Sequence, residues 1–147
     1  MLKAARKNLA HAGMQGRITL FHGDAENPGR AMPHALRTFD RIFLSFCLSM
    51  IPDWQGAIRQ ALTLLAPGGE LHIVDFGQSE QMPSAFRSLL QDWLALFHVE
   101  PRKHLRAFLA ELDSESGTRS EFVPMYRGYS WRFVVRLPEA PAGPDEI

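Results

Sequence analysis

LLAPGGELHIVDFG, residues 64 to 77, joins two different patterns of apolar residues. Before it, apolar residues recur every three or four positions from Trp54 to Leu65, as they do along a helix with one buried face. Pro67-Gly68-Gly69 ends this pattern, and a nearly continuous apolar run follows from Leu71 to Phe76. Such runs are typical of strands that are covered on both faces in parallel sheets. The stretch therefore predicts a helix, a tight turn and a buried strand.

A second apolar run, Ile42 to Phe46, lies just upstream of the same helix. Two buried strands joined by one helix predict a right-handed crossover in the parallel sheet of an α/β domain. In such sheets, ligands bind outside the carboxyl ends of the strands. The segment that leaves the first strand, Cys47 to Pro52, is unusually apolar, so we expect it to form a pocket wall or an ordered turn.

The flanking segments predict further elements. Upstream, an apolar stripe from Leu2 predicts a helix closed by Gly13, and Arg17 to His22 predicts a strand that ends at Gly23-Asp24-Ala25. A largely irregular stretch with one helical turn near His34 to Leu36 is expected next. Downstream, the patterns predict helices at about Pro83 to Phe97 and Arg102 to Leu112, then a hairpin of Glu121 to Tyr126 and Tyr129 to Leu137 around Arg127-Gly128. We expect the second hairpin strand at the sheet's edge and a disordered tail over residues 138–147.

Composition excludes several classes of function. The 147 residues contain 16 Lys and Arg and 16 Asp and Glu, and this zero net charge predicts no nucleic-acid partner. A single cysteine, Cys47, excludes an internal disulfide and fits a reducing, cytoplasmic compartment. No apolar stretch approaches the roughly 20 residues that span a bilayer, so we expect no transmembrane segment and at most peripheral membrane contact. The histidines are scattered, and no metal site is predicted.

The order of these elements resembles the class I S-adenosylmethionine-dependent methyltransferases. The resemblance rests on FDRIFLSFCLSMIPDW, LAPGGELHIVDF and the terminal hairpin, and it covers roughly residues 1 to 137 as a partial methyltransferase domain. More narrowly, LSMIPDW, LHIVDFG and YRGYSW are similar to the lipid head-group N-methyltransferases of betaine-lipid synthesis. The implied fold is a Rossmann-like sheet, and the implied cofactor is S-adenosylmethionine.

Two features of that family are missing from the sequence. The family's first strand ends in a glycine-rich loop and its second in an acidic residue, and neither precedes the segment that begins at Met1. The resemblance therefore implies a domain truncated at its N-terminus, without its first two strands. In the family's sheet those strands lie between the ones that match Arg17 to His22 and Ile42 to Phe46, so we expect a gap in the sheet.

The resemblance also implies cofactor-binding residues. Asp24 matches the residue that accepts a hydrogen bond from the adenine amino group, and Ala25 would contribute its backbone amide. Ser45, Phe46 and Leu48 lie where the family's fourth strand opens onto the cofactor. The alternatives are that Asp24 belongs to an ordinary Gly-Asp turn and that Phe46 only packs in the core.

Residues near the hairpin turn are candidates for the substrate side. Tyr126, Arg127 and Tyr129 combine aromatic rings with a cation, which suits a phosphate or carboxylate and a methylated ammonium. The alternative is a two-residue turn with cross-strand aromatic pairs. We expect Cys47 to be a buried structural thiol and Asp53 to cap a helix, whereas Asp75 would either face the crevice or cap a turn.

These observations predict methyl transfer from S-adenosylmethionine to an amine, such as a lipid head group, in the complete protein. Such a transfer depends mostly on alignment of donor and acceptor, which explains why no sharp catalytic residue stands out. One alternative is a non-catalytic fragment or subunit without a complete cofactor site. Another is a C- or O-methyltransferase of a quinone-like small molecule.

Overall fold

The computed structural model describes residues 2–28, 32, 38–79, 81–84, 88 and 102–140, and the chain divides into two compact units, Met1–Arg37 and Thr38–Ile147. In the first unit, helix α1 spans Leu2–His11, and Gly13 follows it with a φ of 65°. The predicted strand from Arg17 to His22 is wrong, because these residues form a turn and an irregular segment. A strand needs a neighbour for its backbone N–H and C=O groups, and the described part of this unit contains none.

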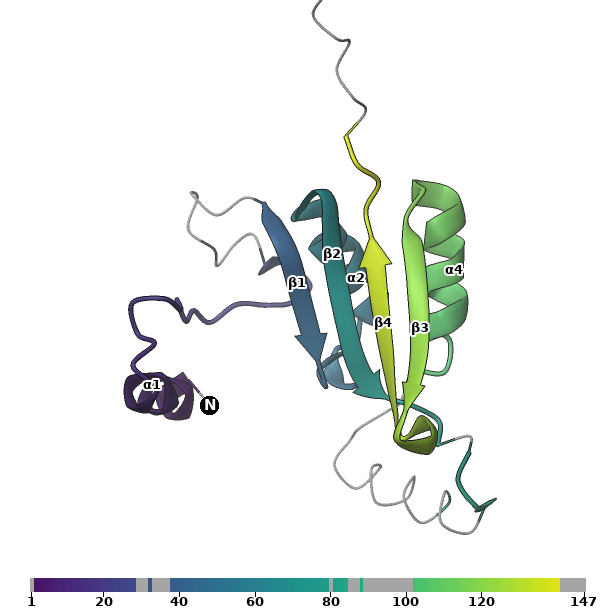
Figure 1. Ribbon diagram of the computed structural model, residues 1–147, viewed down its shortest axis with the longest axis horizontal. Helices are drawn as coiled ribbons and strands as arrows, with labels where there is room; N and C mark the ends of the chain where they lie inside the picture. The colour runs from purple at the N-terminus through teal and green to yellow at the C-terminus, as the bar shows by residue number, and fades with distance from the viewer. Residues whose placement is uncertain are drawn as a thin grey trace, which may run out of the picture. The chain divides into compact units, whose positions relative to one another are not determined.

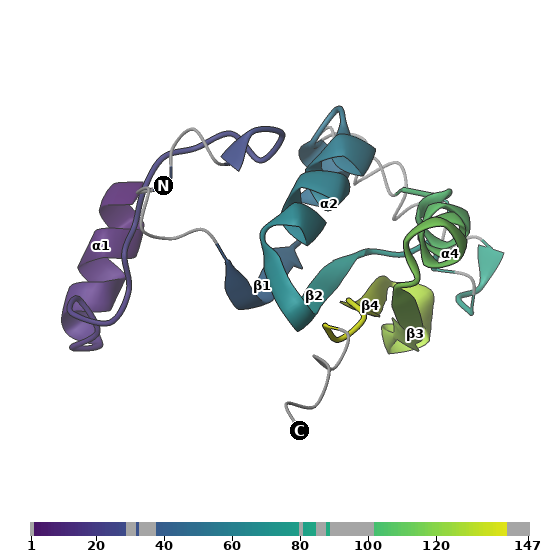
Figure 2. The same cartoon turned by 90° about the horizontal axis from the view of Figure 1, so that it is seen from above.

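The second unit is a four-stranded sheet with two helices on one face (Figures 1 and 2). Its elements, in chain order, are β1 (Phe39–Ser45), η2 (Leu48–Met50), α2 (Trp54–Thr63), β2 (Leu65–Phe76), α4 (Leu105–Ser116), β3 (Arg119–Met125), η3 (Tyr126–Gly128) and β4 (Ser130–Arg136). The strand order is β1-β2-β4-β3, with β1 parallel to β2 and the other pairs antiparallel. This confirms the predicted α/β fold with a parallel crossover and a C-terminal hairpin.

Both helices form where the sequence predicts them. Asp53 caps α2, because its Oδ1 accepts the N–H of Gly56 at 2.9 Å. On α4 the predicted apolar face is buried, and the helix ends at Gly117, which has a left-handed φ of 66°. The core between the helices and the sheet is built around residues from both layers, among them Ile58, Leu71, Leu105, Leu109, Phe133 and Val135.

The Pro67-Gly68-Gly69 segment differs from the predicted tight turn. Strand β2 already pairs with β1 at Leu65, opposite Phe39, and pairs again at Glu70, opposite Arg41. Residues 66–69 therefore bulge out of the ladder. Gly68 has a φ of 74°, and a Cβ on Gly69 would lie 2.8 Å from the carbonyl oxygen of Ala66. The two glycines thus allow one strand to contain the bend.

The expected position of the second hairpin strand at the sheet's edge is wrong. Strand β4 lies between β2 and β3, so β3 is the edge strand (Figure 1). Apolar residues alternate with polar ones along this strand, and Trp131, Phe133 and Val135 of the apolar set are buried, but Val134 on the other face is also only 5% exposed. Strands with neighbours on both sides bury more of both faces, which this alternation does not reveal.

Several predictions fall outside the described residues: the turn near His34 to Leu36, most of the helix from Pro83 to Phe97, and residues 141–147 of the tail. At the start of the tail, the carbonyl of Pro138 accepts the N–H of Gly68 at 3.1 Å. Within the described ranges, no helix is long and apolar enough to cross a membrane.

Candidate functional site

The candidate site is the edge of the sheet at which β1 and β2 both end. Ser45 at the end of β1 is opposite Val74, and Phe76 at the end of β2 is opposite Ser130 at the start of β4. The turn η3 lies at this same edge, below the arrowheads of β1 and β2 in Figure 1. We call this end of the sheet, where β1 and β2 finish and β4 begins, the carboxyl edge. Because ligands of open α/β sheets bind outside the carboxyl ends of the strands, it is the natural place for a ligand.

An aromatic row crosses this edge. The Phe46 and Phe76 rings are 5.0 Å apart between centroids, and the Tyr129 ring meets Phe76 edge-on at 5.8 Å. Phe46 is 39% exposed and has a φ of 48°, although its N–H donates to the carbonyl of Val74 at 2.7 Å. A left-handed conformation costs a non-glycine residue about 1–3 kcal/mol, and such strain concentrates at ligand sites. The row therefore offers exposed π surface on a fixed backbone.

The segment after Phe46 is an ordered turn, as expected. Met50 N–H donates to Cys47 O and Ile51 N–H to Leu48 O, which forms the single turn η2. The Leu48 side chain is fully buried in the core. In this structure the Leu48 side chain belongs to the core, and its predicted role in cofactor binding stays a prediction. Of the three predicted residues here, Ser45 and Phe46 are exposed at the edge.

The side chain of Asp75 bonds to this turn. Asp75 is only 3% exposed, and its carboxylate accepts hydrogen bonds from Ser49 N–H at 3.2 Å and from Phe76 N–H at 2.7 Å. Burial raises the pKa of the Cys47 thiol, and the negative charge of Asp75 raises it further. Cys47 thus remains a protonated thiol at neutral pH, which agrees with the predicted structural role and not with a nucleophile.

The hairpin turn brings the three substrate-side candidates to the carboxyl edge. Tyr126 and Arg127 both have left-handed φ values, 49° and 57°, and Tyr126 is 78% exposed. Of these three, Tyr129 joins the aromatic row, through its contact with Phe76 of β2. The aromatic pairs across the hairpin that the alternative expected are those of Phe122 with Trp131 and Phe133. The turn is longer than the predicted two residues, because η3 spans Tyr126–Gly128.

The segment after β2 fixes this turn in place. Gly77 N–H donates to the Tyr129 carbonyl and Ser79 N–H to the Gly128 carbonyl, both at 2.8 Å. A Cβ on Gly77 would collide with the Gly128 carbonyl oxygen and the Trp131 indole. The close approach of the two backbones therefore requires glycine at residue 77.

Asp24 and Ala25 belong to the first unit. Both are exposed, and Asp24 Oδ1 accepts Glu26 N–H at 3.0 Å. This is the turn geometry of the simpler alternative for Asp24. Their predicted roles in cofactor binding stay predictions.

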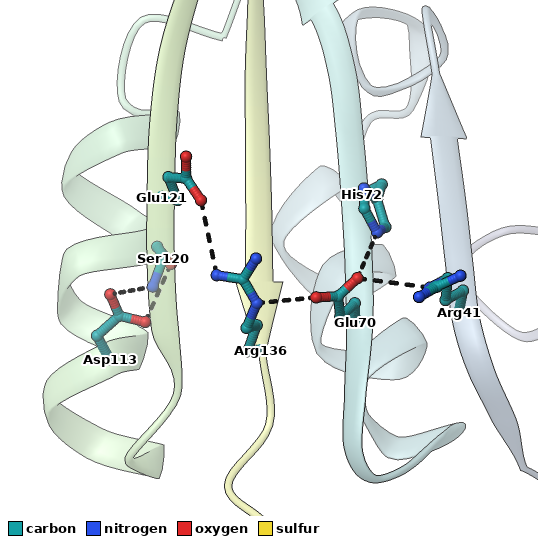
Figure 3. Close-up of polar contacts among 7 residues, drawn as sticks. All are labelled: Arg41, Glu70, His72, Asp113, Ser120, Glu121 and Arg136. Atoms are coloured by element: carbon teal, nitrogen blue, oxygen red, sulfur yellow. Dashed lines mark hydrogen bonds and ion pairs between the residues drawn. The ribbon is translucent and has the colours of Figure 1, made fainter.

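A charged cluster on the open sheet face lies nearer the other end of β2 (Figure 3). Glu70 accepts a hydrogen bond from Arg136 at 2.8 Å, lies 3.0 Å from His72 Nε2 and pairs with Arg41 at 3.5 Å. The bonds from Arg136 and His72 hold the pKa of the Glu70 carboxyl below its usual value. This cluster links three strands across the sheet but supplies no group to the carboxyl edge.

Sequence reasoning missed three contributors to the edge: Phe76, the buried hydroxyls of Ser49 and Ser130, and Arg102. Phe76 could have been recognised from the sequence, because it is the last residue of its apolar run, just as Phe46 is the last residue of the run before it. The Ser49 and Ser130 hydroxyls have no hydrogen-bond partner in the described structure. Arg102 carries no sequence signal at all, since its partners lie about fifty residues away.

Comparison with known sequences gives one family. Residues 1–101 match the sequence model of the ubiE/COQ5 methyltransferase family. The ubiquinone/menaquinone biosynthesis C-methyltransferase UbiE of Klebsiella pneumoniae is 36% identical over 104 residues, which cover 69% of this chain and 38% of the relative. The protein of the same name from Escherichia coli O1:K1 is 33% identical with the same coverage. The chain thus spans 38% of the length of these curated relatives.

Solved structures agree on the fold. An O-methyltransferase family protein from Burkholderia thailandensis superposes with a TM-score of 0.64 at 17% identity, over 94% of this chain and 41% of that one. Mitomycin 7-O-methyltransferase MmcR gives a TM-score of 0.67 at 21% identity, over 92% of this chain and 38% of its own. The α/β sheet described above is therefore a methyltransferase-like fold.

Proposed function

The chain belongs to the ubiE/COQ5 methyltransferase family, and from this we propose that the carboxyl edge binds S-adenosylmethionine for methyl transfer in the complete protein. The observation that carries the proposal is the family match over residues 1–101, which include β1, η2, α2 and β2. These elements form the edge where α/β sheets bind their ligands. The narrower resemblance to betaine-lipid enzymes is not needed for this step.

The residues of the edge fit part of this cofactor. S-adenosylmethionine supplies a methyl group on a positively charged sulfur. Phe46 offers an exposed ring for the adenine and packs against Phe76, which in turn contacts Tyr129. The family's glycine-rich loop, which takes the methionine part, has no counterpart in these 147 residues. The contribution of this edge is therefore an aromatic surface for the adenine.

For the acceptor, we propose a carbon atom of a quinone-like small molecule. This rests on the names of the relatives, which are C-methyltransferases of ubiquinone and menaquinone biosynthesis. Methylation of a ring carbon must release the ring proton. We expect a group other than Asp75 to accept this proton, because the Asp75 carboxylate is only 3% exposed and is already bonded to two backbone amides.

An amine, as on a lipid head group, is the second candidate acceptor. The aromatic row favours this acceptor, because π faces attract a methylated ammonium. Only the unprotonated amine can take the methyl group, so this acceptor also has to lose a proton before the transfer. Tyr126 and Arg127, exposed at the same edge, suit the carboxylate or phosphate of such a head group.

Transfer of a radiolabelled methyl group by the full-length protein distinguishes the two acceptors. We expect label in a quinol that lacks one ring methyl and has a short side chain, and none in dimethylated aminolipid. Label only in the aminolipid would favour the amine. Label in neither would refute both acceptors.

Cofactor binding is tested separately by thermal unfolding of the 147-residue chain with and without S-adenosylhomocysteine. A ligand that binds only the native state at 100 times its dissociation constant adds about 2.7 kcal/mol of stability. An upward shift of the transition supports a site within these residues. A cooperative transition without a shift would mean that this chain does not bind the cofactor by itself, as the non-catalytic alternative predicts.

A further inference from the structure

The turn after β1 is bound by an arginine from a distant part of the chain. Arg102 Nε donates to the Leu48 carbonyl at 3.0 Å. Its Nη2 donates to the Ile51 carbonyl at 2.7 Å and to the Ser49 carbonyl at 3.3 Å. One guanidinium therefore bonds to three carbonyls of a single short turn.

Asp75 holds the same turn through one of its backbone amides. Ser49 N–H points to the Asp75 carboxylate at 3.2 Å, while the Ser49 carbonyl faces Arg102. A cation on the carbonyls and an anion on an amide both match the local peptide dipoles. The conformation of the turn is thus fixed by two charged side chains that come from β2 and from the segment before α4.

This fixation matters for Phe46, which directly precedes the turn. Its left-handed φ of 48° is unfavourable for a residue with a side chain and persists only where the surroundings over-determine it. On one side Phe46 N–H is bonded to Val74 of β2. On the other side the chain enters the turn that Arg102 and Asp75 hold.

We infer that Arg102 is a positioning residue for the methyl-transfer site, and that it acts by setting the place and angle of the Phe46 ring through this turn. The inference rests on the proposed function, because the ring matters only if the carboxyl edge binds the cofactor. Arg102 lies three residues before Leu105, whose side chain is 1% exposed at the start of α4. Arg102 is therefore held near the packed core by the buried start of α4.

The planar guanidinium of arginine suits the three hydrogen bonds to this turn. Two nitrogens of the guanidinium reach three carbonyls at once, whereas lysine would present a single ammonium at the end of a flexible stem. We therefore expect Arg102→Lys to keep part of the effect and Arg102→Met to abolish it. Arg59→Met is the matched control, because it removes a guanidinium that lies over the core ring of Phe108 and pairs with Glu115 on α4, away from the turn.

Amide hydrogen exchange of the 147-residue chain tests the contact itself. We expect the amides of Met50 and Ile51 to exchange at least about tenfold faster in Arg102→Met, because the loss of even one of its three hydrogen bonds to the turn corresponds to about that factor. The amide of Val135 in the core should exchange at the wild-type rate, and so should all three in Arg59→Met. Equal acceleration at all three amides of Arg102→Met would indicate general destabilisation and overturn the inference, as would unchanged exchange in the turn.

The affinity for S-adenosylhomocysteine, measured by calorimetry on the same proteins, tests the link to function. We expect it to fall about tenfold in Arg102→Met and less in Arg102→Lys, with Arg59→Met at the wild-type value. If wild type binds and Arg102→Met binds equally well, the inference is wrong and the proposed function stands. If wild type does not bind, the proposed function fails for this chain, and the positioning role fails with it even where the exchange result holds.

Discussion

Removal of the Asp75 carboxylate should destabilise the protein and alter the chemistry of its cysteine. The carboxylate is 3% exposed and accepts the backbone N–H groups of Ser49 and Phe76. A hydrogen bond to a charged group contributes about 1.5–3 kcal/mol when its partner is left buried and unpaired. Asp75→Ala removes both acceptors, so we expect the free energy of unfolding to fall by about 3–4 kcal/mol. That is a large part of the 5–15 kcal/mol typical of a small domain.

Asp75→Asn separates the charge from the shape of the side chain. Asparagine retains one carbonyl oxygen, but its amide group sets a donor against the second N–H. We expect a loss of about 2 kcal/mol, measured by urea unfolding with an unchanged slope. Wild-type stability in both variants would refute the account of the turn.

Cys47 reports on the same change. Since the charge of Asp75 adds to the rise that burial causes in the pKa of the thiol, Asp75→Asn should lower that pKa and leave it above the ordinary value. Alkylation of Cys47 by iodoacetamide at mildly alkaline pH should then be faster in Asp75→Asn than in wild type. A slower reaction would contradict the proximity of the two groups.

Three other changes have defined outcomes. Gly77→Ala should lower the free energy of unfolding by about 1–3 kcal/mol, because the added Cβ has no space. Gly16→Ala is the control, because a Cβ there meets nothing within 4 Å, and it should leave the free energy of unfolding unchanged. Thermal unfolding of the two variants measures the difference. The pKa of Glu70 is lower in the folded state than its ordinary value near 4.5, so its carboxylate stabilises the fold above that value, and this contribution is lost as the pH falls through the lower folded-state pKa. Glu70→Gln should therefore make stability depend less on pH in this acid range, as measured by urea unfolding at a series of pH values. Phe46→Ala should weaken binding of S-adenosylhomocysteine by about 1–3 kcal/mol if adenine stacks there. Phe43→Ala, which removes an exposed ring within β1, should leave the affinity unchanged in calorimetry.

Local sequence patterns correctly predicted the elements that depend on residues close together in the chain. The apolar face of α4 and the cap at Asp53 follow from spacing and from side-chain chemistry. The hairpin follows from alternation around Arg127-Gly128, although only the structure shows three residues in the turn. Each of these depends on neighbours a few residues apart.

The errors concern partners that are distant in sequence. Arg17 to His22 has a strand-like composition but no strand to pair with among the described residues of its own unit, so composition could not decide its state. Strand β4 carries an edge-like alternation yet lies inside the sheet, since strand order depends on the path of the whole chain. In the site, Phe46 was predicted from the resemblance to the methyltransferase family, but local sequence patterns give no sign of the bonds of Arg102 to the turn.

The most direct test of the central claim is a titration of the isotope-labelled 147-residue chain with S-adenosylhomocysteine, followed by amide chemical shifts in NMR spectra. We expect saturable shifts at Ser45, Phe46 and Cys47 on the carboxyl edge. We expect none at Gly117 or Arg136, which lie where β3 begins and β4 ends, at the opposite edge of the sheet. Shifts confined to that opposite edge, or no shifts at millimolar ligand, would contradict a cofactor site at the carboxyl edge.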